Sequence, residues 1–213
     1  MSQSNENGRK GRGRPKVFNR DAALDKAMAL FWQHGYEATS MAHLVEATGA
    51  KAPTLYAEFH NKEGLFRAVL ERYICQFAAQ QEAQLHCDDK PFATVLESYF
   101  IEVARCFTSR DTPSGCFMIN TSSALAASSS EIADTIKTRH AQQARSLQNF
   151  LKDRQQRGEI AERCRIPELA LWLNCVIQGM SVSAREGADF ETLRGIIDTT
   201  FAILPALIQA EAG

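Results

Sequence analysis

The sequence predicts an all-α protein. After residue 18, apolar side chains recur every three or four residues in almost every segment, which is the period of a helix with one buried face. No segment alternates apolar and polar residues over the length of a strand. Capping residues and glycines stand at the ends of most of these segments, so the chain divides into a series of separate helices.

Three short helices are predicted first, over residues 19–34, 41–48 and 53–59. Asn19 caps the first, and Gly35 gives it a left-handed stop. Thr39 or Ser40 caps the second. Pro53 lies in the first turn of the third, where its missing N–H costs no hydrogen bond.

Six further helices are predicted, over residues 61–85, 91–110, 116–126 and 131–157, from residue 167, and over residues 189–204. Asn61, the serines 128–130 and Asp189 are the expected caps. Gly158 stops the fourth of the six, and Pro205 bends or ends the last. No internal repeat is present.

The chain divides into a basic arm (residues 1–16), a small helical unit (17–63) and a larger helical body (64–213). No flexible linker separates the unit from the body, because the helix capped by Asn61 joins them. A change in the body can therefore reach the small unit through one stiff element.

Composition and charge exclude several classes of protein. The apolar runs end at about six residues, far below the ~20 of a membrane helix, and the polar start has no secretory signal, so we expect a cytoplasmic chain with no membrane partner.

The six cysteines include no CxxC pair and are expected to be free thiols. No phosphate loop, GxSxG or HExxH occurs, so an enzyme is not expected.

The net charge of −1 hides an uneven distribution. Six basic residues and one acidic residue give residues 1–20 a charge of +5, which leaves −6 for the rest. Within this arm, Arg12 and Arg14 lie in Gly-Arg-Gly-Arg-Pro, which resembles the core of an AT-hook. Such arginines enter a narrow A·T-rich minor groove; a merely solvated tail is the alternative.

The helices over residues 41–48 and 53–59 have the spacing of a helix-turn-helix, whose second member lies in the major groove of DNA. Lys51, Thr54 and Tyr56 suit contacts with phosphates and base edges. For Tyr56, packing in the core is the alternative. A non-catalytic helical adaptor would explain the apolar helices but not this basic and hydroxyl-bearing turn.

Three segments, Thr39-Ser40-Met41 through Gly49, Thr54 to Phe59, and Asn61 to Phe66, resemble the N-terminal domain of the TetR family of repressors, over about residues 17–70. The resemblance implies a homodimer, a three-helix DNA-binding domain that binds an operator of two half-sites, and a six-helix ligand-binding and dimerisation body. It places DNA contacts at Thr39, Ser40, Lys51, Pro53, Thr54, Tyr56, His60 and Lys62. Ala57 and Glu58 depart from the family pattern; Ala57 can approach a thymine methyl, and Glu58 faces solvent or accepts from a cytosine amine.

In the body, two sets of side chains are candidates for sensing an effector that releases the repressor from DNA. Aromatic and sulfur-containing residues could line a pocket for a hydrophobic compound, with plain core packing as the alternative: Phe100, Phe107, Phe117, Met118, Trp172 and Met180. Soft sulfur ligands that favour Cu(I) form the second set, with buried small hydrophobes as the alternative: Cys106, Cys116, Met118 and Cys175. Residues 115–120 and 177–187 resemble a copper-responsive member of the family, which implies copper as inducer and no required cofactor.

The last two helices are expected to form the dimer. Two helices per subunit, each with a broad apolar face, make a four-helix bundle across a two-fold axis. Its candidate anchors are the aromatic and branched residues Trp172, Phe190, Ile197 and Phe201.

Overall fold

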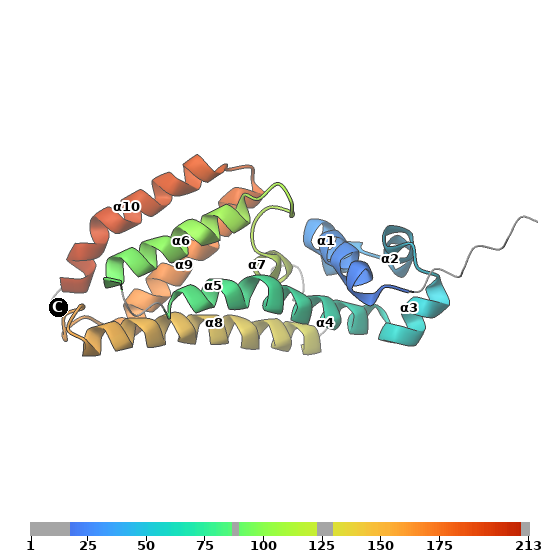
Figure 1. Ribbon diagram of the computed structural model, residues 1–213, viewed down its shortest axis with the longest axis horizontal. Coiled ribbons are helices and arrows are strands. Elements are labelled where there is room, and N and C mark those ends of the chain that lie inside the picture. The colour runs from blue at the N-terminus through green and yellow to red at the C-terminus, as the bar shows by residue number, and fades with distance from the viewer. Residues whose placement is uncertain (1–17, 87–89, 123–129, 210–213) are drawn as a thin grey trace, which may run out of the picture.

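The structure, a computed structural model, describes residues 18–86, 90–122 and 130–209 (Figure 1). Every regular element in these ranges is a helix, so the all-α prediction is confirmed. The basic arm with Arg12 and Arg14 lies outside the described residues, as do residues 123–126 of a predicted helix and the predicted caps at 128 and 129.

The small N-terminal unit contains α1 (Arg20–Ala38), α2 (Met41–Thr48) and α3 (Ala52–Phe59). The Asn19 side chain caps α1 by accepting from the Ala22 N–H. Gly35 was expected to end this helix. It instead interrupts the helix, with φ 80° and ψ 170°, and a further turn continues to Ala38.

A long rod follows, made of α4 (Lys62–Tyr73), the π-helical turn η1 (Ile74–Ala78) and α5 (Ala79–Gln84). The sequence predicted one regular helix here. The apolar spacing cannot reveal the change, because the extra residue that a π turn accommodates still leaves Tyr73 and Phe77 near each other, with ring centroids 5.3 Å apart. π turns inside helices occur frequently at functional sites.

The body is completed by five helices, α6 (Phe92–Phe107), α7 (Phe117–Ser122), α8 (Ser130–Gln156), α9 (Ile166–Arg185) and α10 (Phe190–Gln209). Pro205 was predicted to bend or to end the last helix. It does not end α10, which continues to Gln209. The proline is exposed. It removes one backbone N–H donor from the helix without ending it.

The molecule is elongated, with α1, α2 and α3 at one end and α6, α9 and α10 stacked toward the other (Figure 1). The rod and α8 run lengthwise beneath them, joined by an ion pair between Arg139 and Glu71. No helix in the described parts of the chain is long and apolar enough to cross a membrane.

One hydrophobic core extends from α1 through the rod to α10. Its centre is an aromatic group in which Trp32 of α1 meets Tyr73 of α4 edge-on at 5.2 Å and Phe117 of α7 at 5.9 Å. Phe66 of α4 lies 5.7 Å from Phe117. The small unit and the body thus share buried side chains, although the boundary at residues 63 and 64 stays a prediction.

An ion-pair clamp ties α1 to α4 at the surface of this core. Arg72 donates to both carboxylate oxygens of Asp25, at 2.6 and 2.8 Å, and to Asp21 at 3.1 Å. The hydrogen bond from Arg72 lowers the pKa of the Asp25 carboxyl below its ordinary value. This pair therefore contributes stability only while Asp25 is ionised.

Replacing Asp25 with Asn tests this clamp. The folded pKa lies below the unfolded value of about 3.9, so the contribution is present above that pH and disappears as the pH falls through the folded pKa. Because the Asp25 side chain is 47% exposed, we expect Asp25→Asn to lower the free energy of unfolding by only about 0.5–1 kcal/mol at pH 7. Urea denaturation measures this loss, with the exposed Asp134→Asn in α8 as control; an equal loss at pH 7 and pH 3 would contradict the account.

Candidate nucleic-acid interface

The turn between α2 and α3 is built around Gly49, which takes the left-handed conformation with φ 68° and ψ 12°. A side chain there would be strained, so glycine suits the position. Ser40 caps α2 with a capping box, in which the Ser40 Oγ accepts from the His43 N–H and the His43 Nδ1 accepts from the Ser40 N–H. Of the two predicted caps, Ser40 is therefore the one used.

One face of α3 is buried and the other is open to solvent. Leu55 and Phe59 are 0% and 4% exposed and hold the helix against the core. Tyr56 is 47% exposed, so packing in the core, the alternative considered for it, does not occur. Lys51 and Pro53 are also exposed, and α3 therefore presents a basic residue and a phenol on its outer surface.

Four other predicted DNA contacts lie in different surroundings. Thr39 is 1% exposed, and its hydroxyl donates to the Gly35 carbonyl at 2.7 Å. Lys62 is half-buried, donates to the Tyr36 carbonyl at 2.9 Å and lies 4.1 Å from the centre of the Tyr36 ring. Thr54 is half-buried and His60 exposed. The outer surface of the unit thus carries Ser40, Lys51, Pro53, Tyr56 and His60.

The corner between α3 and α4 fixes the direction of α3. Asn61 caps α4 by accepting from the Gly64 N–H at 2.8 Å. A Cβ on Gly64 would lie 2.1 Å from the Phe59 carbonyl oxygen, so only glycine allows this approach. His60 between them has a positive φ of 68°, a conformation that non-glycine residues rarely adopt. The corner is therefore closely packed and sterically constrained.

The outer face also carries an ion pair that sequence reasoning did not predict. The Arg20 Nε donates to the Glu58 Oε1 at 2.7 Å. The two residues are 38 positions apart, so no local spacing could reveal the pair. Two roles are predicted for Glu58, facing solvent or accepting from cytosine, and Arg20 is counted only in the charge of residues 1–20.

Residues 23–69 match the family model described as bacterial regulatory proteins, tetR family. The chain is also 64% identical over 201 residues to the HTH-type transcriptional repressor ComR of Escherichia coli (strain K12), covering 94% of this chain and 96% of that protein. The chain belongs to the TetR family. It is a DNA-binding transcriptional repressor and not an enzyme, as predicted, and the adaptor alternative is wrong.

Two further relatives agree with this assignment. The HTH-type transcriptional repressor BdcR of Escherichia coli (strain K12) is 29% identical, covering 85% of this chain and 86% of that protein. A solved structure of the TetR family transcriptional regulator CifR, a cysteine mutant complexed with 26bp double-strand operator DNA, is 30% identical. It superposes with a TM-score of 0.79, over 89% of this chain and 98% of that chain.

The predicted pocket residues lie mainly in the core of the repressor. Five of them are 0–3% exposed, namely Phe100, Phe107, Phe117, Met118 and Met180; Trp172 is half-buried. Met118 lines a cavity of about 90 Å³ with Ile74, Tyr99 and Arg139. None of the other five predicted pocket residues is among the residues that line this cavity.

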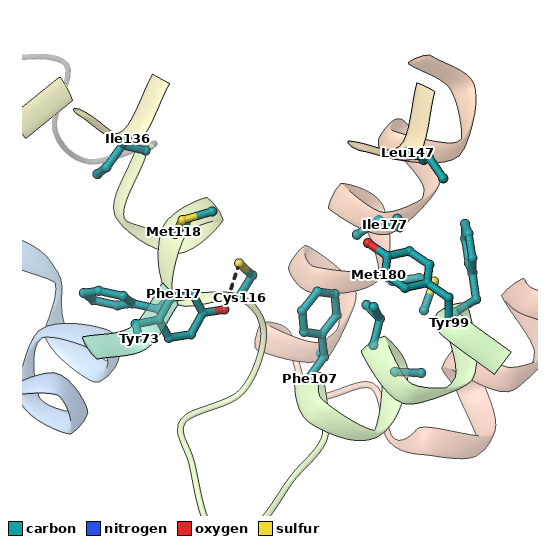
Figure 2. Packing of buried hydrophobic residues seen from close by; sticks show 14 of the residues in the cluster. Tyr73, Tyr99, Phe107, Cys116, Phe117, Met118, Ile136, Leu147, Ile177 and Met180 are labelled. Carbon is teal, nitrogen blue, oxygen red and sulfur yellow. Dashed lines mark hydrogen bonds between the residues drawn. The ribbon is translucent and has the colours of Figure 1, made fainter. Parts of the chain in front are cut away.

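The predicted cysteine ligands differ in their exposure to solvent. Cys116 is buried, Cys106 is partly buried and Cys175 is exposed on α9. Within the described residues, no group of three or more His, Cys, Asp or Glu side chains could hold a metal ion. The Cys116 Sγ instead lies 3.3 Å from the Tyr73 hydroxyl (Figure 2), and burial raises the pKa of both groups.

We expect Lys51→Ala and Tyr56→Ala each to weaken operator binding about tenfold on different sequences alike, because phosphate contacts carry no base preference. The slope of log affinity against log salt should fall by about 1 for Lys51→Ala. Fluorescence anisotropy with a labelled operator duplex measures both quantities. Lys152→Ala, an exposed lysine on α8, is the charge-matched control, and equal behaviour of Lys51→Ala and this control would count against the interface.

Proposed function

We propose that the repressor acts as a homodimer that places two α3 helices in successive major grooves of an operator, and that an effector bound in the body releases it. The observation that carries the proposal is the exposed basic and aromatic face of α3 on a unit that shares its core with the body. Half-sites on one side of B-form DNA are about 34–36 Å apart. A ligand that favours any other spacing weakens binding. Such a protein works in the cytoplasm, where it meets DNA.

The exposed apolar side chains of the last two helices support the proposed dimer. Leu171 and Val182 on α9 are 66% and 48% exposed, and Ile203 on α10 is 45% exposed. Two such helices from each subunit can bury exposed apolar side chains in a four-helix bundle. Of the predicted anchors, Ile197 is 0% exposed in its own subunit. Trp172, Phe190 and Phe201 are half-buried and stay candidates.

The position of Arg20 supports a DNA-binding role for the basic arm. Arg20, the first residue of α1, contacts Glu58 in the last turn of α3. The segment that precedes α1 therefore joins it next to the recognition helix. An arm starting there is well placed to enter the minor groove beside the major groove that α3 occupies. We assign Arg12 and Arg14 to that groove, since its negative potential is strongest over A·T pairs.

Deleting residues 1–16 should therefore cost affinity mainly on operators flanked by A·T pairs, by about tenfold or more, and much less on operators flanked by G·C pairs. Anisotropy titrations of the intact and shortened proteins on the two duplexes measure the difference. An equal loss on both would reduce the arm to a sequence-independent tether.

For the effector, we propose Cu(I) bound between Cys106 and Cys116. The Cys116 Sγ lies 3.3 Å from the Tyr73 hydroxyl, and Cys106 directly precedes Phe107 at the end of α6. The Gly115 N–H donates to the Phe107 carbonyl at 2.9 Å, so the loop between α6 and α7 closes next to both cysteines. Thiolates are soft ligands that select Cu(I), and binding must displace the thiol protons. Cys175, exposed on α9, has no place in this pair.

A path from this pair to DNA runs through buried contacts. Cys116 directly precedes α7, and Phe117 at the start of α7 packs against Trp32 of α1. Movement of the loop on binding copper would displace Phe117 and, through Trp32, the DNA-binding unit. The coupling equals the difference in ligand affinity between the two states, typically about 1–3 kcal/mol.

Titrating Cu(I) under reducing conditions should release operator DNA, with a loss of affinity of about fivefold to a hundredfold. Cys116→Ser should blunt the release, because it removes one of the two proposed ligands, whereas the control Cys175→Ser should not. Anisotropy of labelled operator, with copper measured on the same samples, gives both readouts. Copper binding without any change in DNA affinity would remove copper as the inducer.

The cavity beside Met118 favours a second candidate, a small hydrophobic organic compound. Ile74, Leu85 and Tyr99 supply apolar walls, and Arg139 and Gln143 supply polar groups, which is the usual composition of a ligand pocket. Its volume of about 90 Å³ admits only a small molecule. Release of DNA by such a compound, with no response to Cu(I), would decide for this candidate.

A further inference from the structure

The negative charge of Glu58 is unfavourable on a helix that binds DNA. It lies in the last turn of α3, and its side chain is 38% exposed. DNA carries one negative charge per about 1.7 Å of its axis, so an unpaired carboxylate on this helix would be repelled. The same carboxylate could otherwise accept a hydrogen bond from the amine of cytosine. The residue that binds the Glu58 carboxylate therefore affects both the affinity and the sequence preference of the repressor.

Arg20 binds the Glu58 carboxylate. Besides the 2.7 Å hydrogen bond from its Nε to the Glu58 Oε1, its guanidinium carbon lies 5.5 Å from the centre of the Phe59 ring. Phe59 is 4% exposed and belongs to the core. Arg20 is thus directed along the end of α3 by one polar and one aromatic contact, both on the recognition helix itself.

The pair does little for stability in the free protein. Both side chains are partly exposed, at 52% and 38%, and exposed ion pairs contribute little to stability. Bound DNA changes this balance, because it excludes water and brings phosphates close, and like charges brought together across an interface are strongly unfavourable. The pair therefore has its main effect in the complex.

Building on the proposed placement of α3 in the major groove, we propose that Arg20 determines operator specificity by positioning Glu58. It keeps the carboxylate bonded along the end of α3, so that this helix reads DNA without a free negative charge and without a contact to cytosine. Loss of Arg20 releases Glu58, which then repels the backbone and accepts from cytosine wherever a site offers its amine. Arg20 is thus a positioning residue that acts through Glu58.

The test compares Arg20→Ala, Glu58→Gln and the double variant with the natural chain, with Arg110→Ala, an exposed arginine in the loop after α6, as the charge-matched control. Each protein selects duplexes from a pool with a randomised central segment of about 20 base pairs, and anisotropy gives the affinity for the natural chain's selected operator. Thermal unfolding of each protein gives its stability.

We expect Arg20→Ala to bind that operator about tenfold or more weakly than the Arg110→Ala control, to select additional cytosines, and to keep its melting temperature. The double variant should regain most of the lost affinity and lose the cytosine preference, because no carboxylate remains to be held. If the double variant binds as weakly as Arg20→Ala, or selects the same sequences, Arg20 does not act through Glu58 and the proposal is overturned.

Glu58→Gln alone keeps the proposal testable even if Arg20→Ala fails to fold. A glutamine has the same shape without the charge, so we expect this variant to select the same operator as the natural chain. A changed preference at a cytosine position would show that Glu58 already reads that base in the natural chain, which contradicts the proposed role of Arg20.

Discussion

The packing of Trp32, Tyr73 and Phe117 is the contact on which the rest of the structure depends. These residues come from α1, α4 and α7, and each is at most 3% exposed. Burying a large aromatic side chain contributes several kcal/mol to the free energy of unfolding. The DNA-binding unit and the body are therefore expected to fold as one cooperative unit. The ion pair of Arg72 with Asp25 adds a weaker constraint on the same two helices, α1 and α4.

This shared core connects the body directly to the DNA-binding unit. Tyr73 is the last residue of α4, immediately before the π turn, and its hydroxyl lies against the Cys116 thiol. A ligand that moves the loop ending at Cys116 therefore acts on the aromatic contact rather than on a flexible hinge. At the far end of the rod, the corner at Gly64 ties α4 to α3, because Gly64 lies too close to the Phe59 carbonyl for any side chain at position 64.

The sequence predicts most of the helices, because their limits depend on local chemistry. The second helix was predicted over residues 41–48 and is found there, with its serine cap and left-handed glycine. The π turn after Tyr73 was missed, since it barely alters the apolar spacing. The pairing of Arg20 with Glu58 and the contact of Cys116 with Tyr73 join distant parts of the chain. The spacing of residues along one sequence contains no information on such contacts.

The DNA-binding unit and the body share one core, which should therefore open cooperatively. Native-state hydrogen exchange on Phe117→Leu tests it most directly, since this change loosens the aromatic packing while keeping an apolar side chain. We predict that the buried amides of α1 lose protection together with those of α7, by the same free energy of opening. Loss of protection confined to α7, with α1 unchanged, would contradict the account.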